Sequence, residues 1–168
     1  TSKAYAGSVA GRAVTALISN VTVVGGSVEA DWAGGIVGAG SGTTISDVRR
    51  SAEVLTEAGF DNSVAGGTPG GIAGGIAGEL QRSKLLRASN TGAVRAVSML
   101  ASEPSYIEVA LAGGLVGLAG STTVANSYNT GAVVAVNSAT FAGKSSAWAA
   151  GIAANADAGA KLTDVYNT

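Results

Sequence analysis

The side chains best suited to catalysis in this sequence are carboxylates, because enzymes that cleave polysaccharides use paired acidic residues. Five aspartates spread along the chain are candidates: Asp31, Asp47, Asp61, Asp157 and Asp164. They do not cluster in one segment, so a carbohydrate-active enzyme is an alternative and not the leading interpretation. The chain has no His and no Cys, which excludes a His-based triad, a Cys nucleophile and a His/Cys zinc site within it.

Two glycine-rich segments resemble nucleotide-binding loops only in part. Gly143-Lys144-Ser145 matches the end of a phosphate-binding loop, but Ser138 stands where that loop requires its first glycine. The segment from Gly35 to Gly40 has the glycines of a dinucleotide loop, but it recurs through the chain without alternating strand and helix patterns. We therefore predict no catalytic, cofactor-binding or metal-binding residue, and no cofactor.

Charge and hydropathy narrow the class of partner. The 168 residues include 10 Lys+Arg and 11 Asp+Glu, a net charge of -1, so no basic excess is present to bind a nucleic-acid backbone. The longest strongly apolar run, residues 109–120, is shorter than the roughly 20 residues that a membrane-spanning helix needs. A hydrophobic fraction of 46% is too high for a disordered segment and predicts a folded core.

An internal repeat is the main signal in the sequence. A Gly-Gly-Ile/Leu-Val/Ala-Gly block begins at Gly34, Gly74 and Gly113, and weaker copies begin at Gly7 and Ala150. Apolar residues follow at steps of nine and form three columns: Ile36, Ile45 and Val54 in one copy, Ile76, Leu85 and Val94 in the next, and Leu115, Val124 and Val133 in the third. A side of this length fits one short strand and a turn, and three sides close a coil of about 27 residues.

The repeat predicts an all-β fold, a parallel β-helix or β-solenoid of about five coils with three strands per coil. The chain is a single repeat domain, 1–168, with repeats at approximately 6–32, 33–72, 73–111, 112–148 and 149–168. Turn-forming residues stand two positions after the second apolar column, at Asn20, Asp47, Asn126 and Asp164, with Arg87 as the exception. Gly92 and Gly131 recur at a second corner, where we expect them to supply a positive φ.

Three links between repeats are longer than the first, and each contains an aromatic residue: Phe60, Tyr106 and Phe141. We expect these links to form hairpin-like insertions at one corner of the solenoid. Together with Trp32 and Trp148, the three aromatics pack either as a small core under the insertions or as an exposed flank. Such a flank would bind a partner such as a host protein, a glycan or a neighbouring subunit.

The segment from Gly113 to Val133 begins with Gly-Gly-Leu-Val-Gly and continues, after a short spacer, with Asn-Ser-Tyr-Asn-Thr-Gly-Ala-Val. This pattern resembles the GLUG repeat of bacterial surface proteins. That repeat occurs in adhesins, in filamentous-haemagglutinin-like proteins and in the non-catalytic stalks of IgA-specific metalloendopeptidases. The resemblance implies an extracellular or cell-surface location, a spacer or adhesive role, and no active site.

We therefore expect a structural or adhesive repeat module of a secreted or surface-exposed bacterial protein, acting as a stalk or an interaction surface, and not an enzyme. A solenoid exposes unpaired strand edges at its ends unless they are capped. Other coils of the same protein, or neighbouring subunits, are expected to add strands there. The first alternative is a self-assembling extracellular filament or sheath subunit, and the second is the carbohydrate-active β-helix enzyme.

Overall fold

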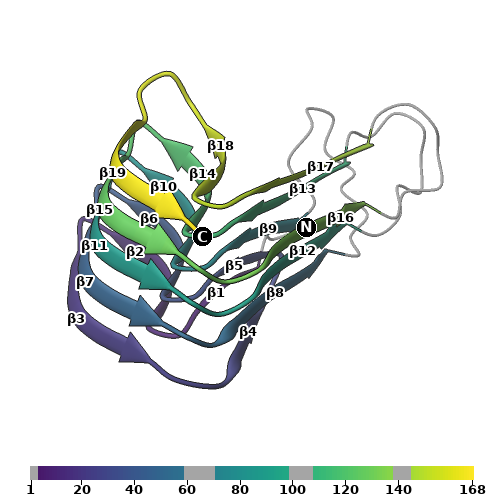
Figure 1. The fold of residues 1–168 in the computed structure, drawn as a ribbon, viewed down its shortest axis with the longest axis horizontal. Helices are drawn as coiled ribbons and strands as arrows, with labels where there is room; N and C mark the ends of the chain where they lie inside the picture. Colours follow the sequence, from purple (N-terminus) through teal and green to yellow (C-terminus); the bar gives the residue numbers. More distant parts are fainter. Residues whose placement is uncertain (1–3, 59–70, 99–107, 138–144) are drawn as a thin grey trace.

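A computed structural model describes residues 4–58, 71–98, 108–137 and 145–168. Across these ranges the chain forms strands and turns and no helix (Figure 1). The strands belong to four parallel sheets, named A to D in the order in which the chain visits them.

Each sheet collects equivalent strands from successive coils. Sheet A contains β1 (Tyr5–Gly7), β5 (Trp32–Gly34), β9 (Gly71–Gly74), β13 (Glu108–Gly113) and β17 (Ser145–Ala150). Sheet B contains β2 (Ala10–Val14), β6 (Val37–Ser41), β10 (Ala77–Gln81), β14 (Val116–Gly120) and β18 (Ala153–Ala156). Sheet C contains β3 (Leu17–Val23), β7 (Thr44–Arg50), β11 (Lys84–Asn90), β15 (Thr123–Asn129) and β19 (Lys161–Asn167). Sheet D contains β4 (Ser27–Glu29), β8 (Glu53–Ala58), β12 (Val94–Ser98) and β16 (Val133–Asn137).

Neighbouring strands pair in parallel and join equivalent positions of successive coils. One such ladder in sheet C consists of Ile18, Ile45, Leu85, Val124 and Leu162. Its three middle members are fully buried, because the coils above and below cover them. The prediction of an all-β parallel solenoid of about five coils is confirmed.

A complete coil contains four strands, where the sequence interpretation expected three. Three members of the first apolar column, Ile36, Ile76 and Leu115, are fully buried but lie in the turns between sheets A and B. The turn that contains Ile36 is sharp enough to require glycine at Gly34, because a Cβ there would overlap the backbone carbonyl of Val37. The first side of each coil is therefore divided into two short strands, such as β5 and β6.

The solenoid interior has two parts. Sheets B and C enclose the larger part, which contains aliphatic columns with Val37, Leu80 and Leu85 among their members. Sheets A and D extend side by side to the right in Figure 1 and enclose the smaller part. The inward column of sheet A is alanine in every coil: Ala6, Ala33, Ala73, Ala112 and Ala149. Because alanine fills little space, sheets A and D lie close together, which is one use of the alanine-rich composition.

The expected corner stack in sheet C is confirmed. Asn20, Asp47, Arg87, Asn126 and Asp164 have φ values between 50° and 56°. Each coil therefore bends at this position, the one with Arg87 included. Asn and Asp adopt this left-handed conformation more readily than other non-glycine residues.

The expectation of a positive φ at Gly92 and Gly131 is wrong, because the positive-φ glycines of the described residues lie elsewhere. These two glycines are needed for close approach between coils instead. A Cβ on Gly92 would overlap the carbonyl oxygen of Ala52, and a Cβ on Gly131 would overlap the carbonyl oxygen of Gly92.

Much of each long link falls in residues 59–70, 99–107 and 138–144, outside the described residues, and so do Phe60, Tyr106 and Phe141. The hairpin-like insertions and the partner-binding flank therefore stay predictions. The two tryptophans are described and differ in environment. Trp32 is buried in the structure, whereas Trp148 is 47% exposed.

Candidate functional site

A ladder of asparagine carboxamides follows the interior corner between sheets C and D. Asn90 Nδ2 donates to Asn129 Oδ1 at 2.8 Å, and Asn129 Nδ2 donates to Asn167 Oδ1 at 2.8 Å. Asn90 and Asn129 also donate to the carbonyl oxygens of Gly92 and Gly131, each at 2.8 Å. Both asparagines are fully buried, so the ladder satisfies polar groups that would be costly to bury without partners.

The glycine block makes room for this ladder. A Cβ on Gly75 would lie 2.6 Å from Asn90 Nδ2, and a Cβ on Gly114 would lie 2.6 Å from Asn129 Nδ2. Only glycine therefore fits beside each carboxamide. The Gly-Gly block and the downstream Asn-Thr-Gly-Ala-Val segment are two halves of one packing unit, which explains why they recur together.

Arg50 takes the place of asparagine in the second coil, in register with the ladder. It is 2% exposed, and its guanidinium donates to the carbonyl oxygens of Gly35 at 2.7 Å, Ala52 at 3.1 Å and Glu53 at 2.7 Å. A further bond of 2.9 Å joins it to the hydroxyl of Ser8. Burial lowers the pKa of Arg50 from its usual range, and these neutral oxygens replace the water that the buried cation loses.

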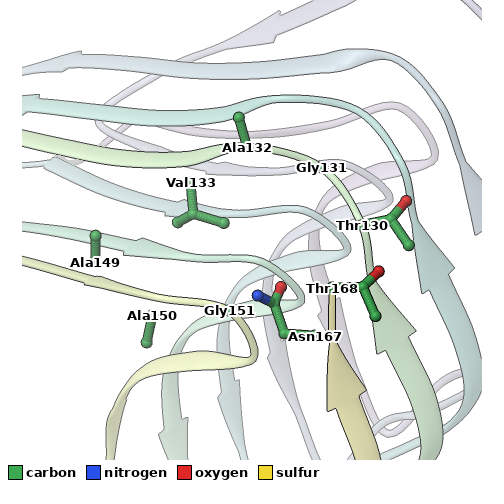
Figure 2. A pocket seen from close by; sticks show the side chains of 9 residues that line it. All are labelled: Thr130, Gly131, Ala132, Val133, Ala149, Ala150, Gly151, Asn167 and Thr168. Atoms are coloured by element: carbon green, nitrogen blue, oxygen red, sulfur yellow. The ribbon is translucent and has the colours of Figure 1, made fainter.

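The ladder ends at an open notch, which Figure 2 shows from close by. Sheet D ends at β16, whereas sheets A and C continue for one more level with β17 and β19. The difference leaves a notch of about 410 Å³ beside β16. Its walls are formed by Thr130, Gly131, Ala132, Val133, Ala149, Ala150, Gly151, Asn167 and Thr168.

Exposed large apolar side chains gather at the two ends of the solenoid. In the first coil they are Val9, Val14, Leu17 and Val24, and in the last strands they are Val134, Trp148, Leu162 and Tyr166. Leu162 is 45% exposed, whereas Val124, its partner one coil below, is fully buried. Both ends are therefore surfaces on which covering apolar groups would stabilise the protein.

Two of the candidate carboxylates, Asp47 and Asp157, accept hydrogen bonds that lower their pKa. Asp47 accepts two hydrogen bonds from Arg87, which lower the pKa of the Asp47 carboxyl. Asp157 Oδ1 accepts the backbone N–H groups of Ser121 at 2.8 Å and Gly159 at 3.0 Å. These bonds, that of Ser121 foremost, lower the pKa of Asp157.

The other three aspartates are placed differently. Asp31 Oδ2 accepts the backbone N–H of Ala4 at 3.0 Å, Asp164 belongs to the corner stack, and Asp61 lies outside the described residues. Within the described ranges, no group of three or more His, Cys, Asp or Glu side chains could hold a metal ion. In the same part of the chain, no helix has the length and hydropathy to cross a membrane.

Sequence reasoning misses one column of large side chains in sheet A. Its members are in register and are Tyr5, Trp32, Ile72, Leu111 and Trp148. Trp32, Ile72 and Leu111 are buried in one cluster, and the rings of Tyr5 and Trp32 meet edge to face at 5.3 Å between centroids. The signal is present in the sequence, because each member stands four positions before a residue of the first apolar column.

Comparison of the chain with protein-family models, with curated proteins and with solved structures finds no match. The resemblance to the GLUG repeat therefore stays a prediction. The functional assignment rests on the sequence pattern, the amide ladder and the two solenoid ends.

Proposed function

We propose that this chain is a structural and adhesive repeat module of a bacterial extracellular surface protein, acting as a stalk or an interaction surface. The observation that carries the proposal is the continuity of its ladders, which join successive coils in four parallel sheets. A stack of this kind holds a fixed length, because backbone hydrogen bonds join each coil to its neighbours. The resemblance to GLUG repeats supports the location at the cell surface.

Buried polar ladders add to the stiffness of the stack. Thr43 N donates to Ser83 Oγ at 3.1 Å, and Ser83 N donates to Thr122 Oγ1 at 3.3 Å. Like the bond between the Asn90 and Asn129 carboxamides, these two bonds form only when successive coils are stacked in register. A coil that slips would leave buried polar groups unpaired, which suits a module that keeps its shape under load.

Labelling of intact cells tests the surface location. We expect antibodies against this chain to label intact cells of the bacterium that produces it, and added protease to remove the label. A cytoplasmic protein labelled in parallel controls for lysis. Labelling that requires permeabilised cells would contradict the proposal.

The adhesive role is tested on the predicted partner-binding flank, which contains Phe60, Tyr106 and Phe141. We expect the combined replacement of Phe60, Tyr106 and Phe141 by Ala to reduce attachment of the protein to host cells or host glycans. Leu17→Ala, at the exposed N-terminal end of the solenoid, is the control and should attach normally. Unchanged attachment of the triple variant would remove the flank from the proposal.

The second candidate function is that of a self-assembling extracellular filament or sheath subunit. The gathering of exposed apolar side chains at both ends, Leu17 at one and Leu162 at the other, favours it. Electron microscopy and fibre diffraction of the purified chain separate the two candidates. Ordered fibres with a repeat near about 4.8 Å favour assembly, and monodisperse monomers favour the stalk.

A further inference from the structure

We propose that a groove on the outer face of sheet B binds a sugar unit that carries one carboxylate group. The groove has a volume of about 210 Å³ and lies over β6, with residues of β2 and β10 on either side. Tyr5 and Arg82 complete its lining. The inference names a ligand class for the proposed adhesive module and rests on that proposal for its biological setting.

Small side chains of β6 form the floor of the groove. One outward column of sheet B contains, in register, Arg12, Ala39, Glu79, Leu118 and Asn155. Ala39 is the smallest member, so the space above it, between Arg12 and Glu79, is left open. Because two strand spacings separate Arg12 from Glu79, their backbones lie about 10 Å apart. A groove of this size is smaller than the usual site of a drug-sized ligand and suits a single sugar unit.

Two guanidinium groups in the lining can bind a carboxylate. Arg12 and Arg82 are both exposed, and neither forms an ion pair with another residue that the structure describes. Glu79 is the one acidic residue of the lining, so two positive charges and one negative charge give the groove a net charge of +1. Guanidinium N–H groups match the two oxygens of a carboxylate. A ligand with one carboxylate would therefore balance the charge of the groove.

Arg82 adopts a backbone conformation that the repeat does not explain. Its φ is 47°, in the left-handed region that long side chains rarely adopt. The residues at the equivalent corner of three other coils are small and are Thr15, Gly42 and Ser121. Arg87 is also left-handed but is paired with Asp47, whereas Arg82 has no such partner among the described residues. Strained residues of this kind gather at binding sites, which supports a ligand-binding role for Arg82.

Glu79 and Gln81 supply groups that recognise sugar hydroxyls. Gln81 Nε2 donates to Glu79 Oε1 at 3.0 Å, which fixes the two side chains relative to each other. Glu79 Oε2 and Gln81 Oε1 can each accept a hydroxyl proton. A ligand that offers only carboxylates would meet Glu79 as a like charge, which disfavours it. The combination of two arginines with this acceptor pair therefore favours an acidic sugar over an acidic peptide.

Aromatic packing holds Arg12 in place at the opposite wall. The Arg12 guanidinium lies 5.8 Å from the centroid of the Tyr5 ring. The Tyr5 ring packs edge to face against Trp32, with 5.3 Å between the centroids, and Trp32 is buried. A guanidinium held over an aromatic ring has less freedom to lose when a ligand binds. The wall is therefore ordered before the sugar arrives.

Amide NMR titration of the purified chain with sugars tests the inference. One matched pair of probes is the methyl glycosides of glucuronic acid and of glucose, which differ only in the carboxylate. A second pair, sialyllactose and lactose, distinguishes a sialylated glycan from a polysaccharide of uronic acids as the source of the sugar. We expect at least one acidic probe to bind saturably and at least about tenfold more tightly than its neutral counterpart. Tetraglutamate, an acidic peptide, should bind at least about tenfold more weakly than that acidic probe.

Three variants locate the binding. Ala39→Leu fills the groove, as Leu118 fills the equivalent place two coils further on, and should weaken binding at least about tenfold. Arg82→Gln removes one guanidinium at an exposed position and should weaken binding at least about fivefold. Arg49→Gln removes the same charge from an exposed position outside the groove and should leave binding unchanged. Circular dichroism checks that each variant is folded.

The results that would overturn the inference are specific. They are absent binding of both acidic sugars, equal binding of each acidic sugar and its neutral counterpart, or equally tight binding of tetraglutamate. Normal binding by Arg82→Gln would also overturn it, and this variant decides the matter if Ala39→Leu does not fold. These measurements use the isolated chain and do not depend on its location in the cell, so failure here and failure of the proposed function are distinguishable.

Discussion

Arg87 and Asp47 form a bidentate ion pair between successive coils at the bend of sheet C. Arg87 Nε lies 2.6 Å from Asp47 Oδ1, and Arg87 Nη2 lies 2.7 Å from Asp47 Oδ2. The backbone of Arg87 has a φ of 50°, a conformation that disfavours arginine compared with Asn or Asp. The ion pair with Asp47 is therefore formed by a residue whose own backbone conformation is unfavourable.

Replacement of Arg87 should separate the backbone preference from the ion pair. Arg87→Asn loses the pair but introduces a residue suited to the left-handed conformation, as at Asn126. Arg87→Ala loses the pair and keeps the strain. We expect the alanine variant to unfold at clearly lower urea concentration than the asparagine variant, measured by circular dichroism. Equal midpoints would contradict this account.

The stabilisation from this pair should disappear in acid. The hydrogen bonds from Arg87 lower the pKa of Asp47 in the folded state, whereas the unfolded chain has the ordinary value of about 3.9. The folded state therefore binds the proton less readily, so the stabilisation is complete above the ordinary value and is lost as the pH falls through the lowered one.

Denaturation at two pH values checks this sign. The difference in free energy of unfolding between the unchanged chain and Asp47→Asn should be largest near about pH 7 and should shrink as the pH falls below about 3.9. Other carboxyls titrate in both proteins and cancel in the difference. A difference that stays constant or grows in acid would show that the carboxylate does not act through Arg87.

The amide ladder should be more sensitive to mutation than the exposed corner stack. Asn129→Leu removes one of the two acceptors of the buried Asn90 Nδ2 and the donors to Gly131 O and Asn167 Oδ1, which should cost about 3 kcal/mol or more in free energy of unfolding. Asn126→Gly, three residues away on the exposed corner, keeps the left-handed backbone and should cost less than about 1 kcal/mol. Urea denaturation measures both, and similar losses would argue against the ladder.

The direction of the Asn129 side chain could not be predicted from strand alternation. Simple alternation from the inward Val124 places Asn126 and Tyr128 inside as well. The left-handed Asn126 instead shifts the alternation by one residue, so Ser127 and Asn129 are buried and Asn126 is exposed. The sequence shows that Asn129 recurs, but the tertiary bend determines which way it points.

The apolar columns were predictable because each buries one aliphatic residue per coil at a constant spacing. Ile45 and Leu85 are fully buried, as their recurrence predicts. The number of strands per coil could not be predicted, because burial of Ile36 is equally compatible with a strand and with a turn. The contact between Gly34 and Val37 that sharpens the turn depends on backbone geometry, which residue spacing alone does not contain.

Glycines of two kinds should respond differently to substitution. At Gly114 a Cβ would lie 2.6 Å from Asn129 Nδ2 and would overlap the carbonyl oxygen of Gly151, so Gly114→Ala should cost about 3 kcal/mol or more. Gly25 has a φ of 78° with open space around it, and Gly25→Asn should cost less than about 1 kcal/mol. Thermal denaturation ranks the two variants, and a reversed order would contradict the assignment of Gly114 to close packing.

Substitution of Arg50 tests whether the asparagine ladder can be extended by one coil. An asparagine here would stand in register with Asn90, where it could donate to Asn90 Oδ1 and to the carbonyl oxygen of Ala52, the acceptor that Arg50 now uses. Arg50→Asn loses the bonds to Gly35 and Glu53 but keeps a donor for Ala52 and gains a bond to Asn90, so it should lower the free energy of unfolding less than Arg50→Met does. Arg50→Met keeps the length of the side chain but leaves the carbonyl oxygens of Gly35 and Ala52 unpaired, and should cost about 2 kcal/mol or more. If urea denaturation finds the asparagine variant as unstable as the methionine variant, the second coil does not offer Arg50 and asparagine equivalent partners.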